Sequence, residues 1–269
     1  KPFLLDGSAL GTAWLLALSM PPLAPWGLIV IATLFAIVVA KHLYGGLGNN
    51  LFNPAMVGYA VMLISFPAHM TQWPVVDTLA HAHLSLGDTL RFIFGGELPA
   101  GMKLDALTLA TPLDTLRTQI LLGRPIADIA AQPVFGYVGG KGGELIALAY
   151  LAGGVYLLQQ RIITWHIPLA LLGSLSLLSF GFHAYDAARY AAPWFHLAAG
   201  GALLGAFFIA TDPVTGATTP KGKLIFGAAI GALIYLIRTW GGYPDGVAFA
   251  VLILNMCVPL IDAYTQPRV

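Results

Sequence analysis

The sequence predicts an all-α, polytopic integral membrane protein, and three observations support this fold class. Hydrophobic residues make up 58% of the 269 residues and charged residues only 9%, and the mean hydropathy is +0.79. A soluble domain carries about 25% charged residues, so this chain has too few of them to cover an aqueous surface. The apolar residues also gather into eight segments, and three of these segments recur in a second copy. A soluble protein with an unusually apolar core is the weaker interpretation.

The eight segments approach the length that a membrane-spanning helix needs, about 20 mostly apolar residues. Several are short and interrupted by proline or glycine, which is typical of the discontinuous helices of transporters. Met20-Pro21-Pro22 and Asn53-Pro54 are examples. The segments comprise residues 7–20, 26–44, 52–68, 144–160, 166–183, 194–211, 222–238 and 245–263.

A polar stretch over residues 69–143 separates the third segment from the fourth. Together with the flanking Glu144 it holds seven of the twelve acidic residues, so it is too polar to span a membrane. We predict one short helix in it, near Ser85–Phe94. The chain thus divides into a transmembrane part over 1–68, which is incomplete at its N-terminus, a loop over 69–143 and a second transmembrane part over 144–269.

The first three segments correspond to the last three. Met20-Pro21 and Pro67 in the first copy match Asp212-Pro213 and Pro259 in the second, with both pairs of prolines 192 residues apart. Corresponding segments are five apart, an odd number, so the two copies have opposite orientations in the membrane. This predicts the inverted repeat of many transporters. The intact protein would have five plus five helices, of which the first two are absent from this chain.

The basic residues of the short loops predict the orientation. One side of the membrane has six of them against three acids, whereas five of the seven basic residues on the other side belong to the long loop. Long loops cross largely regardless of charge, so the short ones decide. We therefore expect both termini in the cytoplasm and the loop over 69–143 outside. The six basic residues are Lys1, Lys41, Arg161, Lys221, Lys223 and Arg268, and the three acids are Asp6, Asp212 and Asp262.

Several functional classes receive no support from the residues. The net charge of +1 comes without a basic stripe, so nucleic acid is not an expected partner. The single cysteine, Cys257, excludes a disulfide or a cysteine-based metal site within the chain. His81 and His83 lack a third ligand at a suitable spacing, so we predict no metal site.

Ionisable residues cluster at the ends of the segments, so a relay of carboxylates inside the membrane is not visible. An ion path could instead use backbone carbonyls at broken helices, around Gly45–Asn53 and Gly241–Asp245. The alternative, that these glycines only turn the chain or permit close helix packing, remains open.

Two heptapeptides share the pattern Asp-x-x-Thr-x-Ala-Thr. One runs from Asp105 through Thr108 and Ala110 to Thr111, and the other is Asp212-Pro-Val-Thr215-Gly-Ala-Thr218. The pattern resembles the flavinylation site of membrane flavoproteins, where a transferase attaches FMN to the final threonine through a phosphoester. That chemistry needs a hydroxyl acceptor, small neighbours and an exposed backbone. The alternative is a turn capped by Asp and Thr.

Four stretches in order resemble membrane subunits of the NqrB/RnfD (RsxD) family over essentially the whole chain. They are Lys41-His-Leu-Tyr-Gly-Gly-Leu-Gly-Asn-Asn-Leu-Phe-Asn-Pro-Ala-Met, Ala110-Thr-Pro-Leu-Asp-Thr, Thr211-Asp-Pro-Val-Thr and Gly241-Gly-Tyr-Pro-Asp-Gly-Val-Ala-Phe-Ala.

This resemblance implies a subunit of a redox-driven ion translocase in the bacterial inner membrane. Electrons would pass between ferredoxin and NAD through flavins and iron–sulfur clusters, and Na⁺ or H⁺ would be moved. The partners would be RnfA, RnfB, RnfC, RnfE and RnfG, the flavin transferase ApbE and membrane lipid. No catalytic residue is expected in this chain, which has neither a nucleotide-binding fingerprint nor the cysteines of a cluster.

The resemblance implies that FMN is attached to Thr111, because the transferase of Gram-negative members works on the outer face and Pro112-Leu113 matches the family's modified site. Ala106 and Leu109 depart from the usual glycines. Thr215 and Thr218 would then line an inner site, with a second, non-covalent flavin such as riboflavin as an open hypothesis. The rival functions are a secondary transporter or channel-like protein for a small solute, and a structural anchor for redox partners.

Overall fold

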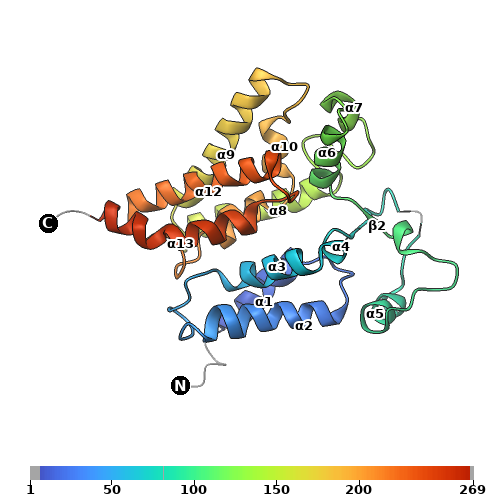
Figure 1. Cartoon of the computed structure of the whole chain (residues 1–269), viewed down its shortest axis with the longest axis horizontal. Helices are drawn as coiled ribbons and strands as arrows, with labels where there is room; N and C mark the ends of the chain where they lie inside the picture. Colours follow the sequence, from blue (N-terminus) through green and yellow to red (C-terminus); the bar gives the residue numbers. More distant parts are fainter. Residues whose placement is uncertain (1–6, 81, 267–269) are drawn as a thin grey trace. The chain divides into compact units, whose positions relative to one another are not determined.

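The computed structural model describes residues 7–80 and 82–266, and within them helices dominate. Two compact units can be distinguished. The first unit runs to Asn50 and resumes over Pro54–Thr111, and the second comprises Leu51–Asn53 and the chain from Pro112 onward. Figure 1 shows the first unit in blue to blue-green and the second in green to red. The predicted all-α class is confirmed.

Three apolar helices form the core of the first unit. Gly58 allows two of them to approach closely, since a Cβ there would lie 2.6 Å from the carbonyl oxygen of Ala32. Small residues at such contacts are typical of membrane helices. The helices are α1 (Ser8–Ser19), α2 (Trp26–Leu34) with its π-helical continuation η1 (Phe35–His42), and α3 (Pro54–Ser65), which the short α4 (Pro67–Met70) follows.

The polar part of the first unit contains the predicted short helix, α5 (Leu86–Gly95). Ser85 caps it by accepting the backbone N–H of Asp88 at 3.1 Å, as helix N-caps commonly do. A two-stranded antiparallel sheet joins β1 (Trp73–Pro74) to β2 (Thr108–Leu109). The 3₁₀-helix η2 (Leu104–Ala106) stands immediately before β2.

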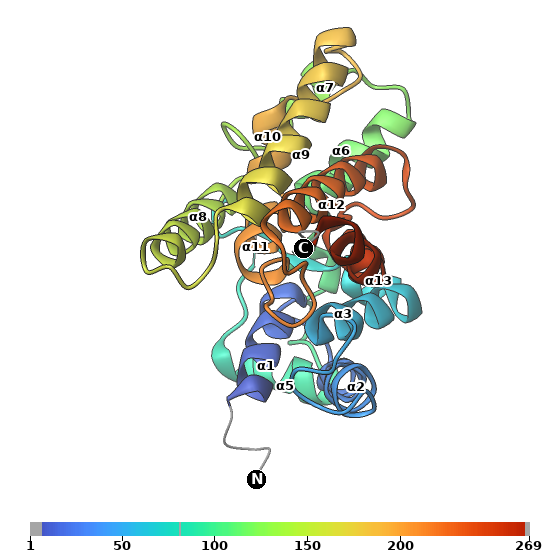
Figure 2. The same cartoon turned by 90° about the vertical axis from the view of Figure 1, so that its left-hand side faces the viewer.

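The second unit is built on two long helices that lie side by side, as the views in Figures 1 and 2 agree. These are α9 (His166–Tyr185) and α12 (Pro220–Trp240). The other helices of this unit are α6 (Pro112–Leu121), α7 (Ile126–Ala130), α8 (Gly143–Gln159) and α13 (Val247–Thr265).

The predicted segment 194–211 is not one continuous helix. It consists of α10 (Pro193–Ala198), α11 (Ala202–Leu204) and the π-helical η3 (Gly205–Ile209). The helix is interrupted at Ala199, which has an extended backbone, and at Gly200, whose φ of 67° is left-handed. Glycine adopts that conformation without the steric penalty of other residues.

Three helices, α9, α12 and α13, are long and apolar enough to cross a membrane, with mean hydropathies of 1.6, 1.4 and 2.0. Shorter apolar helices cover Ser8–Ser19, Trp26–His42, Pro54–Ser65 and Gly143–Gln159. Large apolar side chains such as Leu169 and Leu177 on α9 are more than half exposed, as lipid-facing residues are. The chain is therefore a polytopic membrane protein. Of the residues used to predict its features, Lys1, Asp6, His81 and Arg268 lie outside the described part.

Candidate functional site

The first heptapeptide forms a surface turn that ends at a helix. Asp105, Leu109 and Ala110 are exposed, and Thr111 is half-buried. The hydroxyl of Thr108 donates to the carbonyl of Leu104 at 3.1 Å, which closes the turn before β2. Thr111 directly precedes α6, which begins at Pro112. Proline is favoured at the first position of a helix, so this start follows from the sequence.

The second heptapeptide is a turn closed by its own side chains. Asp212 accepts the backbone N–H of Val214 at 3.1 Å and the hydroxyl of Thr215 at 2.9 Å. Thr215 is buried. The carboxylate of Asp262 on α13 accepts both the backbone N–H of Thr218, at 3.0 Å, and its hydroxyl, at 2.8 Å. Both threonines therefore have a structural role, as in a turn capped by Asp and Thr.

Helix α6, which follows Thr111, is seated firmly within the second unit. At its start Pro112 lies against Gly140, where a Cβ would approach the proline ring to 2.3 Å. Farther along, the guanidinium of Arg117 donates to the carbonyl of Gly242 at 2.6 Å. Its apolar face joins a cluster that includes α7 and α10. The buried members of this cluster are Leu113, Leu116, Ile129, Ala191, Phe195 and Ala199.

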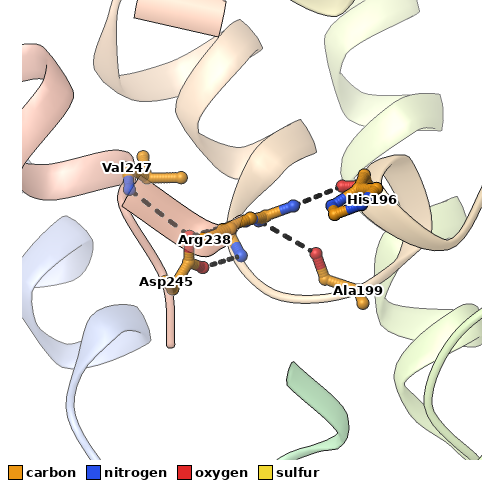
Figure 3. A network of polar contacts seen from close by, with 6 residues as sticks. His196, Ala199, Arg238, Asp245 and Val247 are labelled. Carbon is orange, nitrogen blue, oxygen red and sulfur yellow. Dashed lines mark hydrogen bonds and ion pairs between the residues drawn. The ribbon is translucent and has the colours of Figure 1, made fainter. Parts of the chain in front are cut away.

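A buried ion pair occupies the break between α10 and α11 (Figure 3). The side chain of Arg238 on α12 is 1% exposed, and its Nη2 lies 3.1 Å from Oδ1 of Asp245. The guanidinium also donates to the carbonyls of His196, at 2.6 Å, and Ala199, at 3.1 Å. Asp245 in turn accepts the backbone N–H of Gly201 through Oδ2 at 2.7 Å. Side chains from the α12–α13 region thus hold both ends of the broken helix.

The signs of these charges match the helix ends that they meet. The last carbonyls of a helix carry partial negative charge and its first N–H groups partial positive charge. Arg238 binds the carbonyls at the end of α10, and Asp245 binds the N–H of Gly201 at the start of α11. An ion pair buried with its hydrogen bonds satisfied in this way can hold two helix ends without leaving an unpaired charge.

Aromatic rings cover the neighbourhood of Arg238. The ring of Tyr235, one turn earlier on α12, lies 5.3 Å from the ring of His196 and 5.4 Å from that of Phe182. Trp240 packs edge-on against Phe182 at 5.1 Å. Aromatic pairs at these separations are stabilising beyond the area that they bury. The rings contribute to excluding solvent from the guanidinium.

A second buried polar network joins two asparagines. The side chain of Asn255 on α13 accepts the backbone N–H of Asn53 at 3.1 Å and donates to the carbonyl of Thr215 at 3.0 Å. Both asparagines are about 98% buried. Polar side chains in such positions are rare within membrane proteins and commonly face the interior. This network fixes the Thr215 turn to α13.

The structure separates the predicted site residues into two groups. Asp105, Thr108, Ala110 and Thr111 end the first unit, while Thr215 and Thr218 belong to the second. Of the carbonyls proposed for an ion path, that of Gly242 is bound by Arg117. The sequence interpretation missed the Arg238–Asp245 pair. The signal was an arginine within the apolar run of 222–238, followed seven residues later by an acid.

Comparisons with known proteins agree with this picture. The NQR2, RnfD, RnfE family matches residues 1–269. The chain is 53% identical to a subunit of the ion-translocating oxidoreductase complex of Vibrio vulnificus strain YJ016, over 98% of this chain and 78% of that protein. It is 51% identical to the protein of the same name from Aeromonas salmonicida strain A449, over 100% of this chain and 79% of that protein. The predicted relationship is thus confirmed, and the chain belongs to the NQR2, RnfD, RnfE family.

Proposed function

We propose that this chain carries FMN covalently on Thr111 and relays electrons in a membrane complex that moves Na⁺ or H⁺. The names of the relatives, which are subunits of ion-translocating oxidoreductase complexes, support the redox and ion-moving parts of the proposal. A flavin supplies the electron chemistry, so the protein need only attach, orient and tune it. Ferredoxin and NAD would be the electron partners at the two ends of the complex.

The observation that carries the site assignment is the difference between the two heptapeptides. The hydroxyl of Thr218 already donates to Asp262 at 2.8 Å. That carboxylate would repel the phosphate of an incoming flavin. The residues before Thr111 are exposed and small or flexible enough to admit a transferase, with Ala110 directly adjacent. The pattern is thus better suited to modification in its first copy.

The start of α6 favours a phosphate at Thr111. Helix N-termini present backbone N–H groups and a partial positive charge, which attract phosphate. Thr111 stands immediately before the first residue of α6. Asp114 in the first turn would offset part of this attraction. A phosphoester on Thr111 is therefore compatible with the local structure.

The complex would lie in the bacterial inner membrane, with both termini of this chain in the cytoplasm and the 69–143 loop outside. RnfA, RnfB, RnfC, RnfE and RnfG would be its partners, and a transferase of the ApbE type would attach the flavin on the outer face. A second, non-covalent flavin near Thr215 and Thr218 would need further residues, since the hydroxyls of both threonines are already hydrogen-bonded.

The proposed scaffold is an inverted repeat of five plus five helices. Local parallels within each unit support it. In the first unit Gly7, with φ of 69°, precedes α1, and the buried Lys41 donates to Ser8 at the start of that helix. In the second unit Gly200, with φ of 67°, precedes α11, and the buried Arg238 donates to the adjacent Ala199. Each copy thus sets a basic side chain against the start of its first helix.

Fluorescence of the denatured protein in a gel tests the flavin assignment. Protein from cells that contain the transferase should give a fluorescent band. The band should vanish in Thr111→Val and persist in Thr218→Val and Thr108→Val, because only the final hydroxyl of the first copy is the acceptor. Valine keeps the shape of threonine, which makes the three variants a matched set.

The opposite pattern, loss in Thr218→Val alone, would move the flavin to the second heptapeptide. A wild-type protein without any band would instead favour the secondary transporter, for which the broken helix α10–α11 is a typical feature. If Thr111→Val removed the band but electron transfer by the complex were intact, the chain would be a structural anchor.

A further inference from the structure

The residue after the proposed flavin threonine begins a helix that rests on the buried ion pair. Leu113, the second residue of α6, packs on Gly200. A Cβ at Gly200 would lie 2.4 Å from Cδ1 of Leu113, 2.5 Å from Oδ2 of Asp245 and 3.0 Å from Nη2 of Arg238. The start of α6, the turn that breaks the helix and both members of the ion pair therefore meet around one glycine.

A second contact ties α6 to the loop that carries Asp245. Arg117, one turn farther along α6 than Leu113, donates to the carbonyl of Gly242 at 2.6 Å. The loop between α12 and α13 begins at Gly241 and includes Asp245. Helix α6 thus touches the break through Leu113 and the loop through Arg117. Because Thr111 is bonded to Pro112, this seating restricts where Thr111 can lie.

The ion pair also determines the net charge beneath that seat. Arg238 is buried at 1% exposure and Asp245 is partly buried at 23%. Charges in such places are screened by solvent and salt much less than surface charges. While both groups are charged, their fields largely cancel. Neutralising one of them would leave a single charge below the start of α6.

We propose that Arg238 and Asp245 are positioning residues for the covalent flavin: together they hold the broken helix on which α6 is seated, and they keep the charge below the flavin balanced. This inference rests on the proposed attachment of FMN to Thr111. Each electron that enters the flavin adds one negative charge unless a proton from water follows it. An unbalanced charge nearby therefore changes the flavin's reduction potential.

The test is a redox titration of the covalent flavin in the intact complex. Asp245→Asn leaves the arginine uncompensated, so it should raise the midpoint potential. Arg238→Met leaves the carboxylate uncompensated and should lower it. For charges roughly 12 Å apart the effect on the one-electron equilibrium is about tenfold, which corresponds to about 59 mV. Arg238→Lys keeps the sign of the charge and should stay near the wild-type potential.

The double variant Arg238→Met/Asp245→Asn tests whether charge balance is the cause. It removes both charges, so its potential should return toward the wild-type value, in a double-mutant cycle that isolates the coupling. Lys221→Met, an exposed position at the other end of α12, and Asp128→Asn, an exposed position on α7, are matched controls. Neither control should shift the potential.

Gel fluorescence of the same samples keeps the two proposals distinguishable. A wild-type band without covalent flavin would refute the attachment itself. A normal band together with unchanged potentials in Asp245→Asn and Arg238→Met would overturn the role of the ion pair alone, as would shifts of the same sign in both. If Arg238→Met fails to accumulate, Asp245→Asn decides, because asparagine preserves the size of the side chain.

Discussion

Gly231 on α12 packs directly against the carbonyl oxygen of Leu171 on α9: a Cβ at Gly231 would lie 2.2 Å from that oxygen. One turn earlier, a Cβ at Gly227 would lie 2.7 Å from the carbonyl oxygen of Ile167. The two glycines are four residues apart, as in the motifs that bring membrane helices close together. The contact between the two longest helices thus depends on the absence of side chains.

Gly231→Ala should destabilise the protein, because the backbone of α9 cannot move aside as a flexible side chain could. Overpacking of this kind costs about 1–3 kcal/mol. Thermal unfolding of the purified protein in detergent would show a lower midpoint. Gly173→Ala on α9 is the control, since nothing lies within 4 Å of a Cβ at Gly173. Equal midpoints for the two variants would contradict the close packing of α9 and α12.

Asn255→Ala should also destabilise the protein. It removes the acceptor of the Asn53 backbone N–H and the donor to the Thr215 carbonyl. A buried polar group left without a partner costs about 1–3 kcal/mol. Thermal unfolding again measures the loss. Asn49→Ala is the matched control, because Asn49 is exposed. The prediction fails if both variants unfold at the same temperature.

The positions of the long helices could be predicted from apolar runs alone. The predicted segments 166–183, 222–238 and 245–263 agree within two residues at each end with His166–Tyr185, Pro220–Trp240 and Val247–Thr265. A run of apolar residues shows which stretch must avoid water, and in a membrane that stretch must be helical to satisfy its backbone. The short helix near Ser85 was predictable for another reason, the capping preference of serine.

The break in the segment 194–211 could not be predicted in this way. Gly200-Gly201 is compatible with a continuous membrane helix, in which glycine is frequent. The break depends on Arg238 and Asp245, which lie about 40 residues downstream and bind its carbonyls and N–H groups. Local sequence contains no record of such a partner. For the same reason the similarity between the two heptapeptides did not reveal that Asp262 binds Thr218.

Thr218→Val and Asp262→Ala should have non-additive effects on stability. Each substitution breaks the hydrogen bond between the hydroxyl and the carboxylate, so the double variant should lose less than the sum of the two. A hydrogen bond to a charged group contributes about 1.5–3 kcal/mol, and solvent exposure at Thr218 places this one near or below the lower limit. Thermal unfolding of the four proteins measures the coupling. Strict additivity would show that the contact contributes nothing.

Gly200→Ala should disturb both the fold and the flavin site. Alanine at φ of 67° costs about 1–2 kcal/mol, and its methyl group would also meet Leu113 and Asp245 within 2.5 Å. Gly123→Ala is the matched control, because Gly123 has φ of 78° and nothing within 4 Å of its Cβ. The control should therefore show the backbone penalty alone, whereas Gly200→Ala adds the steric one.

The steric part of this effect should be relieved by shortening the neighbour. In the double variant Gly200→Ala/Leu113→Ala the new methyl group no longer meets Cδ1 of Leu113, so the unfolding temperature should fall by less than the sum of the two single effects. The clash with Asp245 remains, so the recovery should be incomplete. Covalent flavin, measured by gel fluorescence, should decrease in Gly200→Ala and stay normal in Gly123→Ala. Equal flavin content in both would show that the seat of α6 does not govern attachment at Thr111.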